Sequence, residues 1–338
     1  MKQVLLLITL MVIAAGCTTT VMPLPPTPTA APPQVIIATP SYELLGTETN
    51  PIVIGYVIEK DPEKLEETVL NIENELSADS GLVVKSIVFS DYKKLYDSLK
   101  IGSVHAAWVH PLTYITAHRA DLLDVLMLSN HFGFYQYGTQ FLANVESGYR
   151  SYFDPATNKN TSDAITALKQ LNTARPCYME PGSLSGSILP QGILGSIDIT
   201  TNYPSIIQSF TGIVRALYIK GVCDFGTVYS ETGDVRTGSA VIGDLTDVTQ
   251  RVVILWKSDP IIPNLAFAVT PKLDPTSREQ LAKALTEMVV NETGKTMLTA
   301  VNNGYEIQDL RMVDDSIYDP LRVYLSHTST RPEEWLGR

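Results

Sequence analysis

Apolar and polar residues follow two alternating spacings in the part of the chain that begins near residue 50. Short runs rich in β-branched residues are followed by segments in which apolar residues recur every three or four positions, as on a helix face. Strands are expected at 51–58, 82–89 and 104–109, and helices at 61–80, 91–99 and 111–120. This order predicts a parallel sheet with helices on both faces. Such sheets bind ligands beyond the carboxyl ends of their strands.

The first of these helices carries a start signal and a stop signal. Asp61 precedes Pro62, so we expect Asp61 to cap the helix and Pro62 to occupy its first position. Gly81 follows the last residue with helical spacing and is expected to end the helix.

The same pattern returns in the second half of the chain. Strands are expected at 176–180, 223–228, 252–256 and 265–270, and helices at 183–194, 203–217 and 277–290. The sequence therefore predicts two α/β lobes with a cleft between them. Residues 50–140 would begin the first lobe, 141–250 would form the second, and 251–338 would return to the first lobe and end in helices. The chain is expected to cross between lobes near 140–145 and to return near 251–268.

The N-terminus has the plan of an exported protein. Met1-Lys2 is followed by an apolar run from Val4 to Ala15, and residues 14–17 read Ala-Ala-Gly-Cys. This plan predicts a signal peptide over residues 1–16, because the run is shorter than the roughly 20 residues of a spanning helix. A cysteine directly after small residues resembles a bacterial lipobox, which implies a mature chain that begins with lipidated Cys17. Ordinary secretion with an incidental cysteine is the alternative.

The next segment, 17–49, is rich in proline, threonine and alanine. Proline lacks an N–H group and fixes φ, so the segment is expected to be an extended tether rather than a helix or a central strand. A tether behind a lipid anchor implies a globular body held away from a membrane surface. The prolines are Pro23, Pro25, Pro26, Pro28, Pro32, Pro33 and Pro40.

Composition narrows the class of ligand. Hydrophobic residues make up 44% of the 338 residues, enough for packed cores, and the formal net charge is −11. Such a charge argues against nucleic acid, which needs a basic face. It also means that any anion must be held by local N–H and O–H groups, because long-range attraction is missing.

Apart from Cys17 the chain has two cysteines, Cys177 and Cys223. Both lie in short apolar runs that read as strands. In an oxidising compartment they would form one disulfide, and two separate buried thiols are the alternative. So few thiols do not indicate a metal site.

Six ordered runs between about residues 52 and 290 resemble one family, the phosphate, phosphite and phosphonate substrate-binding proteins of ABC transporters. The resemblance implies a type-II periplasmic-binding-protein fold whose two lobes close on the ligand. The runs are Ser90-Asp91-Tyr92 with Leu95 and Leu99, residues 102–108 (GSVHAAW), residues 111–114 (PLTY), residues 180–186 (EPGSLSG), residues 221–224 (GVCD) and residues 258–264 (SDPIIPN).

The run at 180–186 contains the strongest candidate for ligand binding. Ser183 stands where a strand and turn meet the expected helix. The N–H groups of Leu184, Ser185 and Gly186 have no partner within that helix, and the helix dipole adds positive potential there. A helix start of this kind binds anions without lysine or arginine. The resemblance implies that this turn holds the phosphonate oxygens, and a plain Ser183 N-cap is the alternative.

The resemblance implies further ligand contacts. It makes the Tyr114 hydroxyl a donor to the oxyanion, and it places Asp224 where an acidic residue pairs with the amine of aminophosphonates. His110 stands where the family has glycine and would donate to the anion or shape the loop. Tyr137 and Tyr56 are candidates for the cleft wall. Each of these residues has a structural role as its alternative.

Two positions depart from the family pattern. Leu184 replaces a threonine and Val214 replaces a histidine, so two donors to the ligand are missing. Each lost hydrogen bond to a charged group weakens binding by about 1.5–3 kcal/mol unless another group replaces it. Arg215 is a candidate replacement. The ligand is therefore expected to be less highly charged or a different anion.

A hydrolase and a metal-binding protein are the two other classes to which these residues could point. In the run Gly182 to Gly186 the central residue is Leu184, so the nucleophile of a hydrolase elbow is missing, and we expect no enzyme activity. A metal-capturing lipoprotein would use the histidines, but their spacing does not place them on one helix face. These histidines are His105, His110, His118 and His131.

The sequence thus predicts a monomeric substrate-binding lipoprotein of an ABC importer that faces the extracytoplasmic side of a membrane. It would trap a phosphonate-, phosphite- or phosphate-like oxyanion between its lobes and deliver it to a permease. Another small anion, such as an organic sulfonate, is the alternative ligand. Neither a cofactor nor nucleic acid is implied as a partner.

Overall fold

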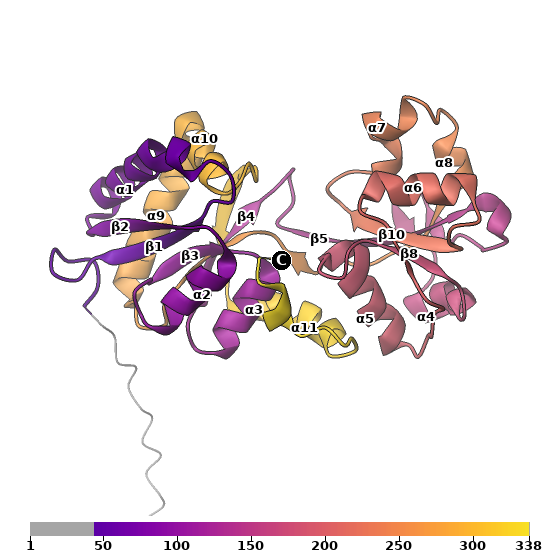
Figure 1. Ribbon diagram of the computed structural model, residues 1–338, viewed down its shortest axis with the longest axis horizontal. Coiled ribbons are helices and arrows are strands. Elements are labelled where there is room, and N and C mark those ends of the chain that lie inside the picture. The colour runs from indigo at the N-terminus through magenta and orange to yellow at the C-terminus, as the bar shows by residue number, and fades with distance from the viewer. Residues whose placement is uncertain (1–43, 338) are drawn as a thin grey trace, which may run out of the picture. The chain divides into compact units, whose positions relative to one another are not determined.

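The structure, a computed structural model, describes residues 44–337 (Figure 1). The first lobe is built on a six-stranded sheet in the order β14-β4-β13-β3-β1-β2. β1 pairs in parallel with β2 and β3, whereas β13 is antiparallel to both β3 and β4. The strands are β1 (Ile52–Val57), β2 (Val84–Phe89), β3 (Ala106–Val109), β4 (Asp124–Asn130), β13 (Ala266–Val269) and β14 (Asp309–Met312).

This sheet, expected to be mainly parallel, is mixed. A parallel neighbour requires a crossover such as a helix, and this holds for β1, β2 and β3. β13 instead enters the sheet directly from the second lobe, and β14 follows at the edge. Neither strand belongs to a strand–helix–strand unit of the first half of the chain.

Helices cover both faces of this sheet, as predicted. One face packs against α1 (Glu66–Ser80), α9 (Pro275–Val290) and α10 (Glu292–Val301), and Trp108 lies in that core. The other face packs against α2 (Tyr92–Lys100) and α3 (Pro111–Arg119), with Ala107 and Val109 in the core. The alternation along β3 thus puts successive residues into different cores.

The second lobe contains a sheet in the order β11-β5-β10-β8-β9, and β12 also pairs with β5. Its strands are β5 (Gln136–Asn144), β8 (Pro176–Tyr178), β9 (Ser205–Ile206), β10 (Phe225–Ser230), β11 (Val252–Lys257) and β12 (Ile262–Pro263). Its helices are α4 (Ala164–Leu168), α5 (Leu189–Ser196), α6 (Phe210–Ile219), α7 (Ser239–Ile242) and α8 (Val248–Arg251). β6 (Phe153–Asp154) and β7 (Lys159–Asn160) form a separate small ribbon.

The chain changes sheets earlier than the sequence suggested. β4 of the first sheet ends at Asn130 and β5 of the second begins at Gln136, ahead of the expected 140–145. The start of β5 was missed because its first residues are largely polar and the apolar run begins only at Phe141. The return between Lys257 and Ala266 falls within the expected range.

Three local expectations are corrected. Asp61 precedes the short helix η1 (Pro62–Leu65), which begins with Pro62 as predicted, but its backbone is left-handed (φ 49°) and its side chain makes no capping bond; its carboxylate accepts from Lys64 at 2.6 Å instead. The helix expected from residue 203 begins at Phe210, because β9 pairs with β8 beforehand and Ser209 caps the helix. The expected tether reaches no further than residue 44, because Leu45 is buried in the first-lobe core.

The signal peptide, Cys17 and the rest of the expected tether lie outside the described residues. Within residues 44–337, no helix combines the length and apolar character that crossing a membrane requires.

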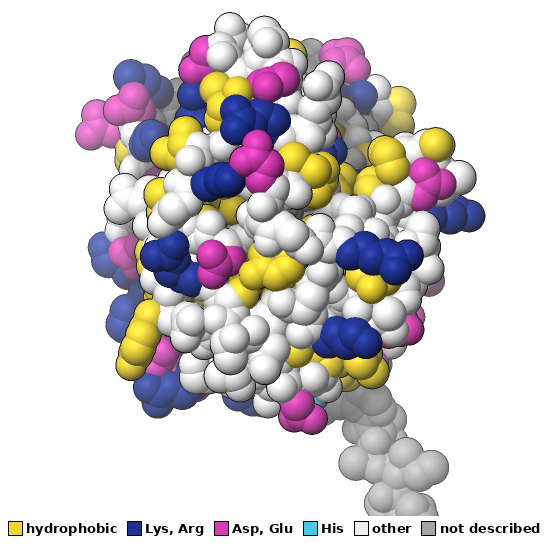
Figure 2. Space-filling view, turned by 90° about the vertical axis from the view of Figure 1, so that its right-hand side faces the viewer, with side chains coloured by type: hydrophobic (Ala, Val, Ile, Leu, Met, Phe, Trp, Pro, Cys, Tyr) yellow, Lys and Arg dark blue, Asp and Glu magenta, His cyan; other side chains and the backbone are white. Residues whose placement is uncertain are grey.

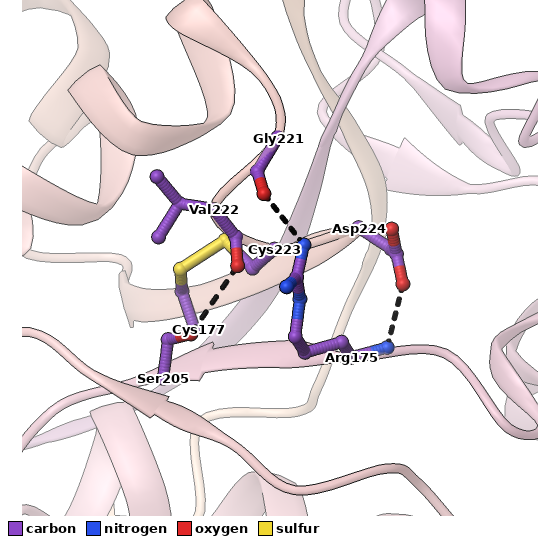
Figure 3. The surroundings of a disulfide bond; sticks show 7 residues. All are labelled: Arg175, Cys177, Ser205, Gly221, Val222, Cys223 and Asp224. Atoms are coloured by element: carbon purple, nitrogen blue, oxygen red, sulfur yellow. Dashed lines mark hydrogen bonds between the residues drawn. A yellow bond between two sulfur atoms is a disulfide. The ribbon is translucent and has the colours of Figure 1, made fainter.

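A disulfide joins Cys177 of β8 to Cys223 in the second lobe, with Cα atoms 5.5 Å apart (Figure 3). Nearby, the Arg175 amide donates to the Asp224 carboxylate at 2.7 Å and its guanidinium donates to the Gly221 carbonyl at 2.7 Å. This cluster fixes the start of β8, the strand that leads toward residues 180–186.

The C-terminal segment contacts both lobes. Helix α11 (Asp319–Leu325) packs against α5, where Gly192 lies against the backbone carbonyl of Tyr324. Before α11, the Tyr318 ring packs at a tilt of 33° against Tyr114 of α3, with ring centroids 4.2 Å apart. One apolar core therefore extends from α3 through α11 to α5.

Candidate functional site

A cavity of about 480 Å³ is lined by residues of both lobes. From the first lobe come His110, Pro111, Phe132 and Tyr305, together with residues that follow β12. From the second lobe come residues 182–185, Phe210 and Tyr229. The described residues that line it include neither lysine nor arginine. An anion bound here would have no lysine or arginine to pair with, and Glu180 also lines the cavity.

The turn between β8 and α5 is fixed by its own backbone. The Ser183 amide donates to Glu180 O at 2.9 Å, and the Met179 amide donates to Gly186 O at 3.0 Å. The Thr227 hydroxyl donates to the same Gly186 carbonyl at 2.9 Å. These bonds tie the turn to β10.

A π-helical turn, η4 (Leu184–Ile188), follows Ser183 and continues into α5. The amides of Ser187 and Ile188 both donate to Ser183 O, at 3.0 and 2.9 Å. The Ser183 hydroxyl accepts from the Gly186 amide at 3.3 Å. Single π turns occur often at functional sites, because they widen the helix at one point.

The amides of Leu184 and Ser185 precede the first intrahelical donor, and neither donates to another residue within 44–337. Both residues line the cavity. The positive end of the helix dipole adds to these two N–H groups. The turn thus offers what a helix start needs for anion binding.

Helix α3 also starts at the cavity. His110 precedes it in an extended conformation (φ −77°, ψ 161°), and Pro111, which has no N–H, is its first residue. The Gly337 amide donates to the Thr113 hydroxyl at 2.5 Å, so the end of the described chain contacts this helix start. Gly337 itself lines the cavity.

Aromatic side chains form much of the remaining wall. His131 stacks on Tyr305 with ring centroids 4.2 Å apart and 18° between the planes, and it lies 4.2 Å from Phe132. Burial raises the pKa of Tyr305, and the Leu265 amide and Ser129 hydroxyl only partly offset this. Burial also raises the pKa of Tyr137. Both hydroxyls therefore stay protonated at neutral pH and keep a proton to donate.

Five of the predicted ligand-binding residues line this cavity: Ser183, Leu184, Ser185, His110 and Tyr137. Gly186 lies just behind them, packed against Met179 and Phe210. Because an added Cβ would lie 2.8 Å from the Phe210 ring, a side chain at Gly186 would displace its neighbours.

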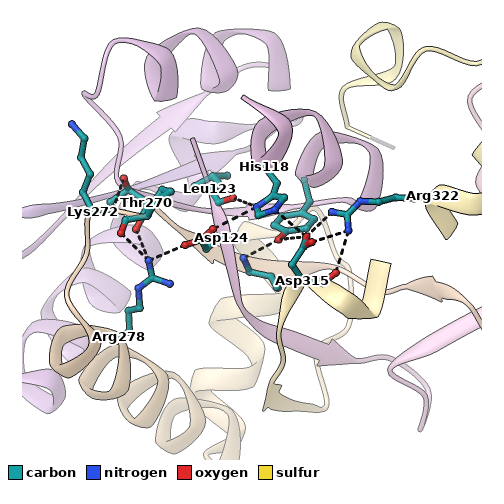
Figure 4. Close-up of polar contacts among 11 residues, drawn as sticks. His118, Leu123, Asp124, Thr270, Lys272, Arg278, Asp315 and Arg322 are labelled. Carbon is teal, nitrogen blue, oxygen red and sulfur yellow. Dashed lines mark hydrogen bonds and ion pairs between the residues drawn. The ribbon is translucent and has the colours of Figure 1, made fainter. Parts of the chain in front are cut away.

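Tyr114 does not line the cavity, which corrects its expected role. It is the fourth residue of α3 and fully buried, and its hydroxyl donates to Asp315 at 2.9 Å while accepting from the Val125 amide at 3.2 Å. Asp315 also bonds Arg322 and lies 3.4 Å from His118 (Figure 4). One helical turn into α3, the ring faces the C-terminal segment.

Tyr56 and Asp224 also lie away from the cavity. Tyr56 is buried in the core between the first sheet and α1, because even-numbered residues of β1 face that side. Asp224 accepts from the Arg175 amide beside the disulfide (Figure 3). Neither geometry supports the expected contact with a ligand.

Comparison with known proteins gives the family. A family model described as "ABC transporter, phosphonate, periplasmic substrate-binding protein" matches residues 54–318. The chain belongs to this family. The phosphate-import protein PhnD of Mycolicibacterium smegmatis is 24% identical over 220 residues, which are 61% of this chain and 62% of that protein. The chain thus matches about three fifths of this curated relative's length.

Solved structures show the same fold. XAC2383 from Xanthomonas citri, bound to chloride, superposes with a TM-score of 0.57 at 14% identity, covering 82% of this chain and 96% of that one. Mh-p37 of Mycoplasma hyorhinis superposes with a TM-score of 0.53 at 9% identity, covering 86% of this chain and all of that one. The predicted two-lobed fold of type-II periplasmic binding proteins is confirmed.

The two departures from the family pattern have different consequences. Leu184 lines the cavity, so its apolar side chain changes the site where a hydroxyl was expected. Val214 is fully buried in the second-lobe core, and Arg215 does not replace the missing histidine. Arg215 bonds the Asp244 carboxylate at 2.7 and 2.9 Å on the exposed side of α6.

Charged groups elsewhere in the second lobe pair with one another. Figure 2 shows basic and acidic side chains intermixed on the face formed by this lobe, with no large area of one sign. Lys220 and Glu146 form one such pair at 2.6 Å. That face lacks the basic stripe that nucleic acid would require.

The histidines do not converge. His105 accepts from the Val53 amide at 3.1 Å within the first sheet, His118 lies near Asp124 and Asp315, and His131 stacks on Tyr305. Within the described part of the chain, no group of three or more His, Cys, Asp or Glu could hold a metal ion.

Sequence reasoning missed several cavity residues, including Phe132, Phe210, Tyr229 and Tyr305. Phe132 and Tyr305 lie 173 positions apart in sequence, so no local pattern brings them together. For the part of the cavity near Asn264, the sequence did give an indication, because Asn264 ends the family-like run at 258–264 and lines the cavity. Its side chain donates to Phe134 O at 2.7 Å and joins the two segments that cross between lobes.

Proposed function

We propose that this chain is the substrate-binding protein of an ABC importer and that it binds a small phosphonate-, phosphite- or phosphate-like oxyanion. The observation that carries the proposal is the turn at Ser183, whose Leu184 and Ser185 amides line a cavity shared by both lobes. Membership of the phosphonate-binding family supports the same class of ligand.

The chemistry of the turn suits binding rather than turnover. A tetrahedral oxyanion accepts several hydrogen bonds at once, and Ser183, Ser185 and two amides supply donors of that kind. These donors would hold the ligand through hydrogen bonds, without a covalent bond, so the ligand could be released unchanged. Leu184 stands where a nucleophilic serine would be needed in a hydrolase elbow.

The relatives point in the same direction. The mycobacterial relative is named as a phosphate-import protein, and the Xanthomonas structure holds a chloride ion. For this chain we propose capture outside the cytoplasm by a monomer, anchoring to a membrane through lipid on Cys17, and delivery to the transmembrane subunits of a permease.

An organic sulfonate is the second candidate ligand. A sulfonate has three oxygens in nearly the same arrangement as a phosphonate but carries one charge. The lining has no lysine or arginine among the described residues and includes Glu180, which favours an oxyanion with a single charge.

Thermal unfolding with phosphate, phosphite, methylphosphonate and methanesulfonate tests the proposal. A bound ligand at 100 times its Kd adds about 2.7 kcal/mol to the unfolding free energy. Replacing both hydroxyls (Ser183→Ala with Ser185→Ala) should remove most of this gain, because hydrogen bonds to charged groups contribute about 1.5–3 kcal/mol each.

The matched control is Ser196→Ala, because the Ser196 hydroxyl donates to Ile193 O within α5 and does not line the cavity. It should keep the full ligand-induced gain. The proposal is wrong if no oxyanion of the panel stabilises the protein. The assignment to the Ser183 turn is wrong if the double variant is stabilised as much as the parent.

A further inference from the structure

The turn between β4 and β5 carries an unusual residue for its backbone. His131 and Phe134 exchange two backbone hydrogen bonds, at 2.7 and 3.1 Å, around a two-residue loop. Phe132 and Gly133 both have positive φ, 49° and 86°. Such loops favour Asn-Gly, Asp-Gly or Gly-Gly, because a bulky side chain is disfavoured in the left-handed region. Phenylalanine at the first position is thus unfavourable for the turn itself.

The turn cannot relax easily. The Gly133 amide donates to the side chains of Asn130 and Gln308, each at 2.9 Å, and a ring nitrogen of His131 lies 2.7 Å from Glu306 O. Residues held in unfavourable backbone regions by their surroundings gather at ligand sites.

Packing does not explain the choice of phenylalanine. The Phe132 side chain is 54% exposed, so little of its apolar surface is buried in the protein. Its ring nevertheless lines the cavity, beside the stacked pair of His131 and Tyr305. Because the Phe132 ring is exposed and its backbone is strained, we attribute the phenylalanine at this position to contact with a bound ligand.

The second lobe supplies rings to the same cavity. Phe210 and Tyr229 meet edge to face with centroids 5.0 Å apart, and both line the cavity. The Phe210 ring also packs against Gly186, the last residue of the run 180–186 that contains the Ser183 turn. An apolar, aromatic region therefore begins directly beside the donors at Ser183.

The size of the cavity agrees with a ligand that has an organic part. Its volume of about 480 Å³ lies in the range of about 300–1,000 Å³ that is typical of pockets for organic molecules. A bare tetrahedral oxyanion would leave most of the aromatic wall without a partner.

We propose that the ligand is an oxyanion with a flat aromatic substituent, such as an aryl phosphonate or an aryl phosphate ester. The oxyanion lies at the Ser183 turn and the ring packs against Phe132. This inference rests on the proposed function and specifies its substrate class.

Calorimetric titration of the full chain with phenylphosphonate and methylphosphonate tests it. The parent protein should bind phenylphosphonate at least about tenfold more tightly, the gain expected from one added aromatic contact. Phe132→Asn introduces a residue that the turn prefers, so its midpoint of thermal unfolding should not fall. The same variant should lose the preference for the phenyl compound while it still binds methylphosphonate.

Phe134→Ala is the matched control, because Phe134 belongs to the same turn and is 37% exposed but does not line the cavity. It should keep the preference. Equal binding of both compounds by the parent protein would overturn the inference and leave the proposed function standing. An undiminished preference in Phe132→Asn would also overturn it. If neither compound, nor phosphate, phosphite or methanesulfonate, binds the parent protein, the proposed function itself fails.

Discussion

Two of the helices that begin at the cavity have starts that differ in what they can bind. The start in the second lobe has Ser183 followed by amides at Leu184 and Ser185 that line the cavity. The start in the first lobe has Pro111, which offers no N–H, and its Thr113 hydroxyl accepts the Gly337 amide. Both starts have the same dipole sign, but Leu184 and Ser185 after the second-lobe cap line the cavity, whereas at the α3 start only His110 and Pro111 do.

A helix start can therefore bind an anion only when its first amides are present and accessible. The start of α3 instead has a structural role, because its next turn carries Tyr114 to the C-terminal segment. Under the proposed function the second lobe binds the oxyanion, and the first lobe supplies part of the aromatic wall and the connection to α11.

Different interactions hold the two helix starts in place. Removing those behind the second-lobe start should have the largest effect on the free energy of unfolding. Behind the second-lobe start, the disulfide fixes β8. Replacing both cysteines (Cys177→Ser with Cys223→Ser) should lower the unfolding free energy by about 2–5 kcal/mol. Urea unfolding measures the loss, which should be similar at pH 4 and pH 7 because no titrating group is involved.

Reductant provides the control for this prediction. It should destabilise the parent protein and leave the double variant unchanged. An equal loss in both would mean that the reductant acts elsewhere. An unaltered unfolding free energy in the variant would contradict the idea that the disulfide supports this start.

The first-lobe start is supported by charge, and the expected effect is smaller. Burial raises the pKa of Asp315, but hydrogen bonds from Arg322 and Tyr114 outweigh it, so the net pKa is lowered (Figure 4). A lowered pKa means that the carboxylate stabilises the fold above its unfolded pKa of about 3.9. Asp315→Asn should therefore lower the unfolding free energy by about 1 kcal/mol at pH 7.

This difference should shrink as the pH falls below about 4, since the parent carboxyl then becomes protonated too. Urea unfolding of parent and variant between pH 3 and pH 7 measures it. Asp319→Asn is the matched control: Asp319 bonds the same Arg322 at 2.9 Å but is more exposed, so its loss should be smaller. A difference for Asp315→Asn that is independent of pH would contradict the charge-based support.

Much of the fold could be predicted from local patterns. The β-branched run at 51–58 predicted β1 to within one residue at each end. The helical spacing that follows it predicted α1, and Gly81 predicted where α1 ends. The turn at Ser183 could be found because its residues are contiguous. The disulfide followed from having two cysteines in an exported chain, although sequence left two free thiols open.

Long-range geometry could not be predicted in the same way. Tyr114 reads as a cavity residue because it follows a strand end, yet its partner Asp315 lies 201 positions later. The aromatic wall joins residues from β4–β5, β10 and the segment before β14. The backbone of Phe132 was also invisible, because phenylalanine gives no sign of a left-handed turn.

A crystal structure of the complex with methylphosphonate tests the central claim most directly. Phosphonate oxygens are expected about 2.7–3.2 Å from the Leu184 and Ser185 amides, the ordinary hydrogen-bond range. An oxyanion bound elsewhere, for instance at the start of α3 beside Pro111, with the Ser183 turn left without contacts, would contradict the account.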